Sequence, residues 1–120
     1  MDKKNLTAEE TFILAVQNQR KNNFQVAENL YRQTLNTNPD HVGAHNNLGV
    51  ILLQLGKLQE AKSSCQKAIQ INPNYASAHN NLGEIFRNLK EFQKAADCFK
   101  KVVTPLGKAQ FLECVYLLNG

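Results

Sequence analysis

The sequence predicts an all-α protein built from stacked pairs of helices, and three features support this prediction. The hexapeptide Ala-His-Asn-Asn-Leu-Gly occurs at residues 44–49 and again at 78–83, which is a separation of 34 residues. Pro39 and Pro73 are separated by the same interval. Alanines recur at this interval too, as Ala27, Ala61 and Ala95. A fixed period of 34 residues indicates an array of similar helical units, each packed on its neighbours.

The first helices are expected where capping and apolar spacing begin. Thr7 and Glu10 have the spacing of a capping box, in which each side chain bonds the backbone amide of the other residue. Asp40, after Pro39, can cap the next unit, and Asn74 can do so after Pro73. The expected helices cover residues 7–21, 24–37, 41–55, 58–71, 75–89, 92–103 and 107–118.

The second unit shows how one pair of helices is encoded. Its first apolar stripe is Leu48, Ile51, Leu52 and Leu55, at helical spacing. Gly56-Lys57 ends this helix, and a second stripe follows with Leu58, Ala61, Cys65, Ala68 and Ile69. Pro73 ends the pair, because proline disfavours the helical conformation of the residue before it. Small residues then mark close helix contacts, at Ala15, Gly49 and Gly83 and at Ala27, Ala61 and Ala95.

Composition excludes several classes of protein. The chain of 120 residues is 42% hydrophobic and has a formal net charge of +4, and its lysines have no interleaved aromatic residues of the kind that stack on nucleic-acid bases. The longest apolar run near the N-terminus, Phe12 to Val16, is too short for a signal peptide or a membrane span. Cys65, Cys98 and Cys114 form no CxxC pair. We therefore expect a cytoplasmic protein without nucleic-acid or membrane partners.

These residues match the tetratricopeptide repeat. In that repeat the first helix carries, in order, a large residue, a Leu, a Gly or Ala, and a further large residue. The second helix carries Ala, an aromatic residue and a second Ala, and Pro follows. The second unit gives His45, Leu48, Gly49, Leu52, Ala61, Cys65, Ala68 and Pro73. The third gives His79, Leu82, Gly83, Phe86, Ala95, Phe99 and Val102, with Gly107 where proline is expected. The first gives Thr11, Leu14, Ala15, Asn18, Ala27, Tyr31, Thr34 and Pro39.

The resemblance implies a right-handed α-solenoid of three helix pairs plus a seventh C-terminal helix. The repeats would cover residues 8–41, 42–75 and 76–107 of one domain spanning 1–120. The repeated hexapeptide most resembles the arrays of O-linked N-acetylglucosamine transferases and related bacterial proteins. The resemblance also places the first helix of each pair along a concave groove, where the expected partner contacts are Phe12, Val16, Asn46, Asn47, Val50, Gln54, Asn80, Asn81, Glu84 and Arg87.

Asn47 and Asn81 are the central candidates in this groove. An amide side chain offers donors and an acceptor together, so it can bond a peptide backbone without reading its sequence. Related repeat proteins use such asparagines in this way, although an asparagine that only fixes a helix contact is the alternative. Members that grip a C-terminal carboxylate use Lys and Arg, whereas this chain has Glu9, Phe12, Ser77 and Asn81 at those positions.

Signs of catalysis and metal binding are weak. His45 and His79 lie one period apart, but no third ligand recurs beside them, and zinc takes three or four protein ligands. No phosphate-binding glycine loop or nucleophile motif is present. We therefore expect neither a metal nor a cofactor and predict a protein-binding module, not an enzyme. The alternatives are an accessory domain of a larger enzyme, such as a transferase, and a self-associating structural module.

The C-terminal segment is unusually apolar for the end of an array. Residues 111–118 contain Glu113 as their only charge. If the segment is the first helix of an incomplete fourth repeat, at an offset of 64 from the second, Leu112 and Tyr116 take the core positions of Leu48 and Leu52. We expect either this continuation or a homodimer that covers the apolar side chains.

Overall fold

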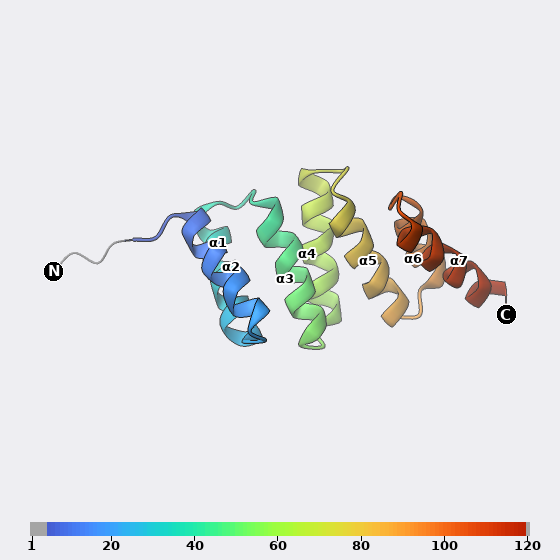
Figure 1. Cartoon of the computed structure of the whole chain (residues 1–120), viewed down its shortest axis with the longest axis horizontal. Helices are drawn as coiled ribbons and strands as arrows, with labels where there is room; N and C mark the ends of the chain where they lie inside the picture. Colours follow the sequence, from blue (N-terminus) through green and yellow to red (C-terminus); the bar gives the residue numbers. More distant parts are fainter. Residues whose placement is uncertain (1–4, 120) are drawn as a thin grey trace.

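Within the part of the chain that the structure describes, seven α-helices follow one another, and they form an elongated array (Figure 1). The computed structural model describes residues 5–119, and within that range the chain contains helices and no strand. The helices are α1 (Ala8–Arg20), α2 (Phe24–Thr37), α3 (Val42–Gln54), α4 (Leu58–Ile71), α5 (Ala76–Asn88), α6 (Phe92–Lys100) and α7 (Pro105–Asn119).

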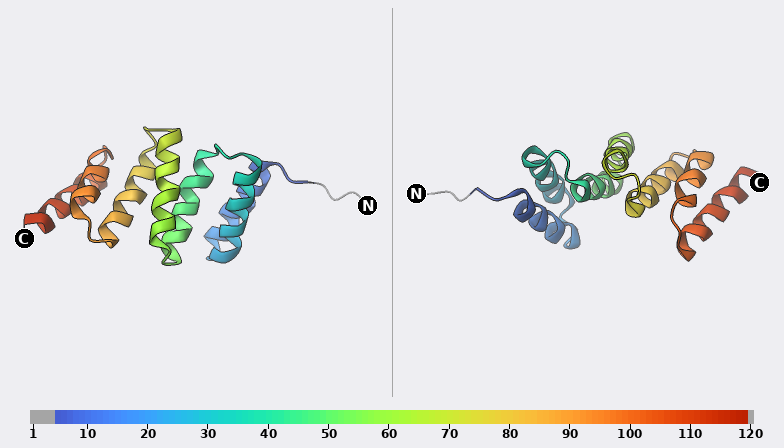
Figure 2. Two further views of the ribbon diagram at one scale, coloured as in Figure 1. Left: turned by 180° about the vertical axis from the view of Figure 1, so that it is seen from behind. Right: turned by 90° about the horizontal axis from the view of Figure 1, so that it is seen from above.

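Consecutive helices pack against each other, so that α1 and α2, α3 and α4, and α5 and α6 form three pairs in chain order. α7 packs on α6, and α3 also contacts α5. The two ends of the array lie at opposite ends of the molecule in every view (Figures 1 and 2). The predicted all-α array of three pairs and a seventh helix is confirmed.

The core repeats with the period of the sequence. Ala27, Ala61 and Ala95 are fully buried, and so are the side chains of Tyr31, Cys65 and Phe99, which lie one helical turn further on. Gly49 and Gly83 are the points of closest approach between paired helices. A methyl group at Gly49 would overlap Cys65 Sγ, and one at Gly83 would overlap the Phe99 ring. The predicted close contacts are therefore confirmed at both glycines.

The turn inside each helix pair contains one residue with a left-handed backbone conformation, at the same position of the repeat. Asn22, Gly56 and Lys90 have φ angles of 62°, 78° and 60° and are 34 residues apart. The amide of the next residue bonds back to a carbonyl five residues earlier, as in Lys57 N–H to Leu52 O at 2.8 Å. This is the hydrogen bond of a Schellman helix end, for which glycine is favoured because it lacks a Cβ.

The predicted N-terminal caps are only partly right. The capping box of Thr7 and Glu10 is present. Asp40 and Asn74 do not cap α3 and α5, because each lies one residue before the N-cap position, which is held by His41 and Tyr75. Their backbone amides donate to the side chains of Asn38 and Asn72, each at 3.2 Å. The residue at the start of α3 is His41, whose Nδ1 accepts from Ala44 N–H at 3.0 Å.

The last two helices depart from the predicted bounds. α6 ends at Lys100 instead of residue 103, and α7 begins at Pro105 instead of 107. The reason is a cap that the sequence analysis overlooked: Thr104 Oγ1 accepts from Gly107 N–H at 3.0 Å, with proline at the first helical position. Proline is favoured there because its missing amide hydrogen would be unpaired in any case.

The predicted register of α7 is wrong. Leu112 and Tyr116 are 63% and 75% exposed, so they do not occupy core positions. Cys114 is fully buried, as Ile51 and Ile85 are, and Gly107 is buried, as Ala44 and Ala78 are. These matches fix an offset of 63 from α3 instead of 64. The helix is therefore rotated by one residue relative to the expectation.

Candidate functional site

The expected binding residues lie on α1, α3 and α5, on a surface that we call the amide face. Phe12, Val16, Asn47, Val50, Asn81, Glu84 and Arg87 are half-buried there, as is Asn80, and Gln54 is exposed. Asn46 is different, because only 3% of its surface is exposed. The expectation that Asn46 offers its amide to a partner is therefore wrong, and the reason lies in its hydrogen bonds.

Asn46 is the centre of a side-chain network between two repeats. Its Nδ2 donates to Asn47 Oδ1 at 3.3 Å and to Ser77 Oγ at 3.1 Å. Its Oδ1 accepts from Asn81 Nδ2 at 2.9 Å. Both amide hydrogens and one lone pair are thus engaged. Asn46 acts as a buried support that fixes the amides of Asn47 and Asn81.

The network continues into the first repeat through Tyr31. Asn47 Nδ2 donates to the Tyr31 hydroxyl at 3.2 Å, and that hydroxyl donates to Gln19 Oε1. Burial raises the pKa of the Tyr31 hydroxyl above its usual range, so the hydroxyl keeps its proton and remains a donor. The orientation of Asn47 is therefore set from both sides.

Asn47 and Asn81 retain unused capacity after these bonds are counted. Asn47 uses one of its two amide hydrogens and one of two oxygen lone pairs. Asn81 uses one amide hydrogen in its bond to Asn46. Each side chain can still offer an N–H and an oxygen lone pair while its position is held. This is the arrangement that a donor and acceptor for a peptide backbone requires.

The apolar end of the amide face is anchored by an aromatic contact that the sequence did not reveal. The Phe12 and His41 rings lie with their centroids 4.5 Å apart, and Phe12 is 5.9 Å from Tyr31. Since His41 Nδ1 accepts a backbone hydrogen bond, its Nε2 carries the proton that reaches Glu9 Oε2 at 3.2 Å. Phe12 is thus held in place by packing before any partner arrives.

The charged end of the face is already paired. Arg87 Nη2 lies 2.6 Å from Glu84 Oε2, and Arg87 Nη1 lies 3.2 Å from Glu113 Oε2 on α7. Gln110 Nε2 donates to the second oxygen of Glu84. One cation faces two carboxylates here, so the cluster carries an excess negative charge. It favours a cationic group on a partner over an anionic one.

The repeats and this face can be compared with known proteins. The tetratricopeptide repeat family matches residues 42–75 and 76–104, which is more than half of the chain. The chain belongs to the tetratricopeptide repeat family. Among solved structures it is similar to the first such domain of Spaghetti (RPAP3), bound to the HSP90 peptide SRMEEVD, at 16% identity and a TM-score of 0.91 over 95% of this chain and 94% of that one.

A second structure of this fold is similar as well. The tetratricopeptide domain of Arabidopsis OM64 aligns at 18% identity and a TM-score of 0.88, over 92% of this chain and 95% of that one. No curated protein sequence matches the chain. At these identities the likeness to solved structures establishes the fold and leaves the ligand open.

The two repeat histidines have a structural role in this tetratricopeptide chain. His45 Nε2 is 2.7 Å from the Pro39 carbonyl oxygen, and His79 Nε2 is 2.7 Å from that of Pro73. Each histidine therefore ties the start of a repeat to the proline turn before it. The same contact recurs one period later, which is what a packing role requires.

The three cysteines are buried free thiols. Burial raises the pKa of Cys65 to about 12 and that of Cys98 to about 11, and it also raises the pKa of Cys114. A thiol needs its thiolate form to act as a nucleophile. None of the three is therefore an activated nucleophile near neutral pH.

No helix in the described part of the chain has the length and apolar character needed to cross a bilayer.

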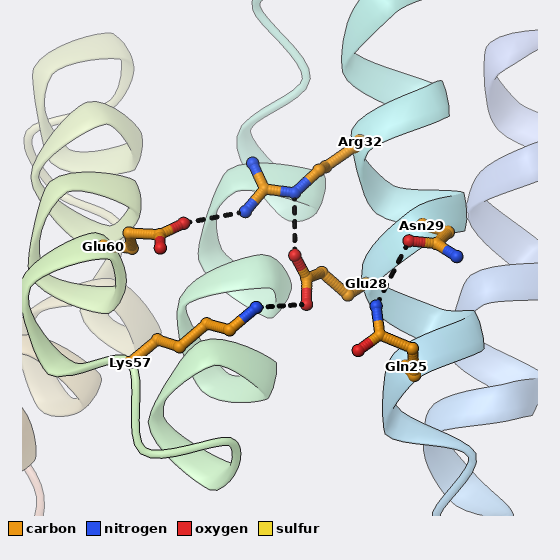
Figure 3. Close-up of polar contacts among 6 residues, drawn as sticks. All are labelled: Gln25, Glu28, Asn29, Arg32, Lys57 and Glu60. Atoms are coloured by element: carbon orange, nitrogen blue, oxygen red, sulfur yellow. Dashed lines mark hydrogen bonds and ion pairs between the residues drawn. The ribbon is translucent and has the colours of Figure 1, made fainter.

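A second polar cluster lies on the side of α2 and α4 (Figure 3). Glu28, whose side chain is 7% exposed, accepts from Arg32 Nε at 2.9 Å and from Lys57 Nζ at 3.3 Å. Arg32 Nη2 also reaches Glu60 Oε2 at 3.0 Å. Burial opposes ionisation of Glu28, but the two hydrogen-bonded cations outweigh it and hold the pKa of Glu28 below its ordinary value. The cluster links the first and second repeats.

Proposed function

We propose that the chain is a protein-binding module whose amide face takes an extended segment of a partner protein. Asn47 and Asn81 bond the backbone of that segment, and the apolar side chains of Phe12, Val16 and Val50 contact its side chains. The observation that carries this proposal is the network through Asn46, which fixes both amides and leaves each with a free donor and acceptor.

The charge of the face narrows the class of partner. Glu9 lies at one end, and the Glu84, Arg87 and Glu113 cluster lies at the other with excess negative charge. The structure of the Spaghetti domain contains the acidic peptide SRMEEVD. In this chain Glu9 and Phe12 occupy positions where a carboxylate grip needs cations. We therefore expect a neutral or basic internal segment as the ligand, and no binding of SRMEEVD in a calorimetric titration.

Peptide selection tests the proposal without a known partner. A displayed library of unstructured peptides is selected on the wild type, and the peptides recovered are measured against the double variant Asn47→Ala, Asn81→Ala. Asn36→Ala is the matched control, because Asn36 is an exposed asparagine on α2. Binding should fall at least about tenfold in the double variant, which corresponds to 1.4 kcal/mol, and stay unchanged in the control.

The stability of the double variant must be measured as well. It removes the bonds to Tyr31 and Asn46, so we expect a cost of about 1 kcal/mol per lost hydrogen bond, with the fold retained. A folded double variant that binds the selected peptides as tightly as the wild type would show that the amides are structural only. A library that returns no peptide would count against peptide binding altogether.

The repeated hexapeptide supports a second candidate, an accessory domain that positions the substrate of a larger enzyme. The hexapeptide, which contains Asn46 and Asn47 in one repeat and Asn80 and Asn81 in the next, resembles the repeat motif of O-linked N-acetylglucosamine transferases. The gene sequence decides between the candidates, because a catalytic domain encoded in the same reading frame would favour the accessory role.

We propose that this chain itself is not an enzyme, and the protonated state of its three buried thiols supports this. Free thiols are also typical of a reducing compartment, which supports a cytoplasmic location. We further propose that the chain self-associates through α7, where Leu112 and Tyr116 are exposed.

A further inference from the structure

Large exposed apolar side chains occur only at the two ends of the described array. Those on the N-terminal side are Leu6, Ile13, Leu14 and Val26, and those on the C-terminal side are Val103, Leu106, Leu112, Tyr116, Leu117 and Leu118. The stretch between residues 27 and 102 has none. The interior repeats thus cover one another, and the uncovered apolar side chains lie at the two ends.

The two ends differ in the residues that their outer helices present outward. Ala44 and Ile51 are fully buried in α3, and in α1 the same positions hold Glu10 and Gln17. α1 thus presents polar residues where an interior helix is apolar. In α7 the equivalent positions hold Gly107 and Cys114, which are buried, and the outward residues of this helix include leucines and a tyrosine. The C-terminal end, with six large exposed apolar side chains against four at the N-terminal end, is therefore the end where we expect a partner to cover the surface.

The outward residues of α7 form a regular stripe. Pro105, Ala109, Leu112 and Tyr116 are all exposed, and they are separated by four, three and four residues. This spacing brings them onto one side of the helix, opposite the buried Cys114. Alternating steps of three and four residues are the pattern of the seam between two coiled helices. We call these four residues the α7 stripe.

Leu112 shows that the cover is not an ordinary second helix of a repeat. In the register set by the buried Cys114, Leu112 occupies the position of Gly49 and Gly83. At those glycines even a methyl group would overlap the paired helix. A helix placed like α4 or α6 would therefore collide with Leu112. The cover must lie farther away, at the upper end of the usual 8–10 Å spacing of packed helices.

Charges beside the α7 stripe indicate which helix covers it. Lys108 lies on one flank and Glu113 on the other, five residues later, and both are exposed. Glu113 uses Oε2 to bond Arg87, which leaves Oε1 available. In a parallel pair of identical helices, residues at these two positions face each other across the seam, so Lys108 meets the partner's Glu113. An antiparallel pair would place like charges together.

We propose that α7 pairs in parallel with α7 of a second copy of this chain, with the α7 stripe as the seam. This inference rests on the self-association proposed above and adds its residues and its direction. The stripe extends over only two heptads, so the dimer is weak and depends on concentration. The amide face lies on α1, α3 and α5 and meets α7 only at its charged end, where Glu113 bonds Arg87. Substitutions on the α7 stripe, which leave Glu113 in place, therefore test dimer formation separately from peptide binding.

Sedimentation equilibrium over a range of concentrations tests the seam. The wild-type mass should rise from 13.5 kDa towards twice that value. Leu112→Gln should weaken association at least about tenfold. Leu106→Gln is the matched control, because Leu106 is on the same helix and 64% exposed but lies off the stripe. A wild type that stays monomeric, or a control as defective as Leu112→Gln, would overturn the proposal. Peptide binding should survive Leu112→Gln.

Cysteine cross-linking tests the direction of the pair. In a parallel pair the two copies of residue 116 lie side by side, so Tyr116→Cys should form a disulfide-linked dimer on mild oxidation. Leu106→Cys, off the stripe, should not. The native cysteines are buried and should not interfere. A dimer that forms in sedimentation but gives no link at residue 116 would overturn the parallel direction and leave self-association standing. Capture of a helix from another protein by a monomeric chain would contradict both.

Discussion

The junction between the first and second repeats and the junction between the second and third share one geometry but not one chemistry. At the first, buried Glu28 bonds Lys57 at 3.3 Å (Figure 3). One period later the same positions hold Lys62 and Glu91, so the charges are exchanged. Glu91, the N-cap residue of α6, approaches Lys94 of that helix at 3.9 Å, and its Oε2 is buried without a hydrogen-bond partner in the described structure.

The 34-residue period therefore determines which positions meet at a junction, but it does not determine which side chains interact there. The second junction is instead linked through Asn46, which bonds Ser77 and Asn81 across the repeats. The first junction therefore combines an ion cluster with the Tyr31 and Asn47 bond, whereas the second depends on one buried amide and on packing. Substitutions inside the helix pairs, at the two junctions and at the turns should therefore change stability to different degrees, with the largest change inside the pairs.

Overpacking the helix pairs should have the largest effect. Gly49→Leu inserts a side chain against Cys65, and Ala61→Leu does so at a fully buried position. Each variant should lose about 3 kcal/mol or more of unfolding free energy, at the upper end of the usual cost of overpacking. Urea unfolding measures this loss. Unchanged stability in both variants would mean that the helices do not approach each other as closely as the structure shows.

Removing the buried side-chain amide of Asn46 should have the second-largest effect on stability, because this amide links the second junction. Asn46→Ala leaves Asn47 and Asn81 without their shared partner, and we expect a loss of about 1–3 kcal/mol. Asn80→Ala is the control, because it occupies the equivalent position one repeat later and is only half-buried. Its cost should remain below about 0.5 kcal/mol, as at other surface sites. Equal costs at the two positions would remove the special role of Asn46.

The first junction should be sensitive to acid. Because the pKa of Glu28 is lower in the folded state than its ordinary 4.5, its contribution is complete above that pH and is lost as the pH falls through the folded-state value. Glu28→Gln should cost about 1–2 kcal/mol at pH 7 and reduce the loss of stability in acid. Urea titrations at several pH values test this, with Glu91→Gln as the control. An equal acid response in Glu28→Gln and wild type would contradict the cluster's role.

The smallest effect is expected at the turns. Lys90 has a φ of 60°, where Gly56 sits in the preceding repeat. Lys90→Gly relieves the left-handed strain and should stabilise the fold by up to about 1 kcal/mol. Lys90→Ala, which keeps the Cβ, should give no such gain. Thermal unfolding of the two variants decides the matter, and a gain shared by both would point to charge instead of backbone conformation.

The sequence predicted the fold well because helix periodicity and the 34-residue repeat are local signals. The bounds of α1 to α5 agree with the prediction to within one residue. The start of α7 was missed although Thr104-Pro105 carries a recognisable cap and first-turn proline. The register was missed separately, because the offset of 64 placed Leu112 in the core, whereas buried Cys114 and Gly107 give an offset of 63 and leave Leu112 at the surface.

The candidate site was predicted less fully, for a physical reason. Asn46 and Asn47 are adjacent and look alike in sequence, but a rotation of about 100° between them buries one and leaves the other half-buried. The partners of Asn46 lie 31 and 35 residues away, and Glu28 reaches a lysine 29 residues on. Such pairs depend on how repeats stack, which a single sequence does not specify.

The central claim is that the side-chain amides of Asn47 and Asn81 contact a peptide backbone. Nuclear magnetic resonance observes these amide groups directly, in ¹⁵N-labelled protein titrated with a peptide selected on the wild type. The account predicts that the side-chain NH₂ signals of Asn47 and Asn81 shift as peptide is added and that the signal of exposed Asn36 does not. Shifts confined to α7, or to the helices α2, α4 and α6, with both amide signals unmoved, would contradict it.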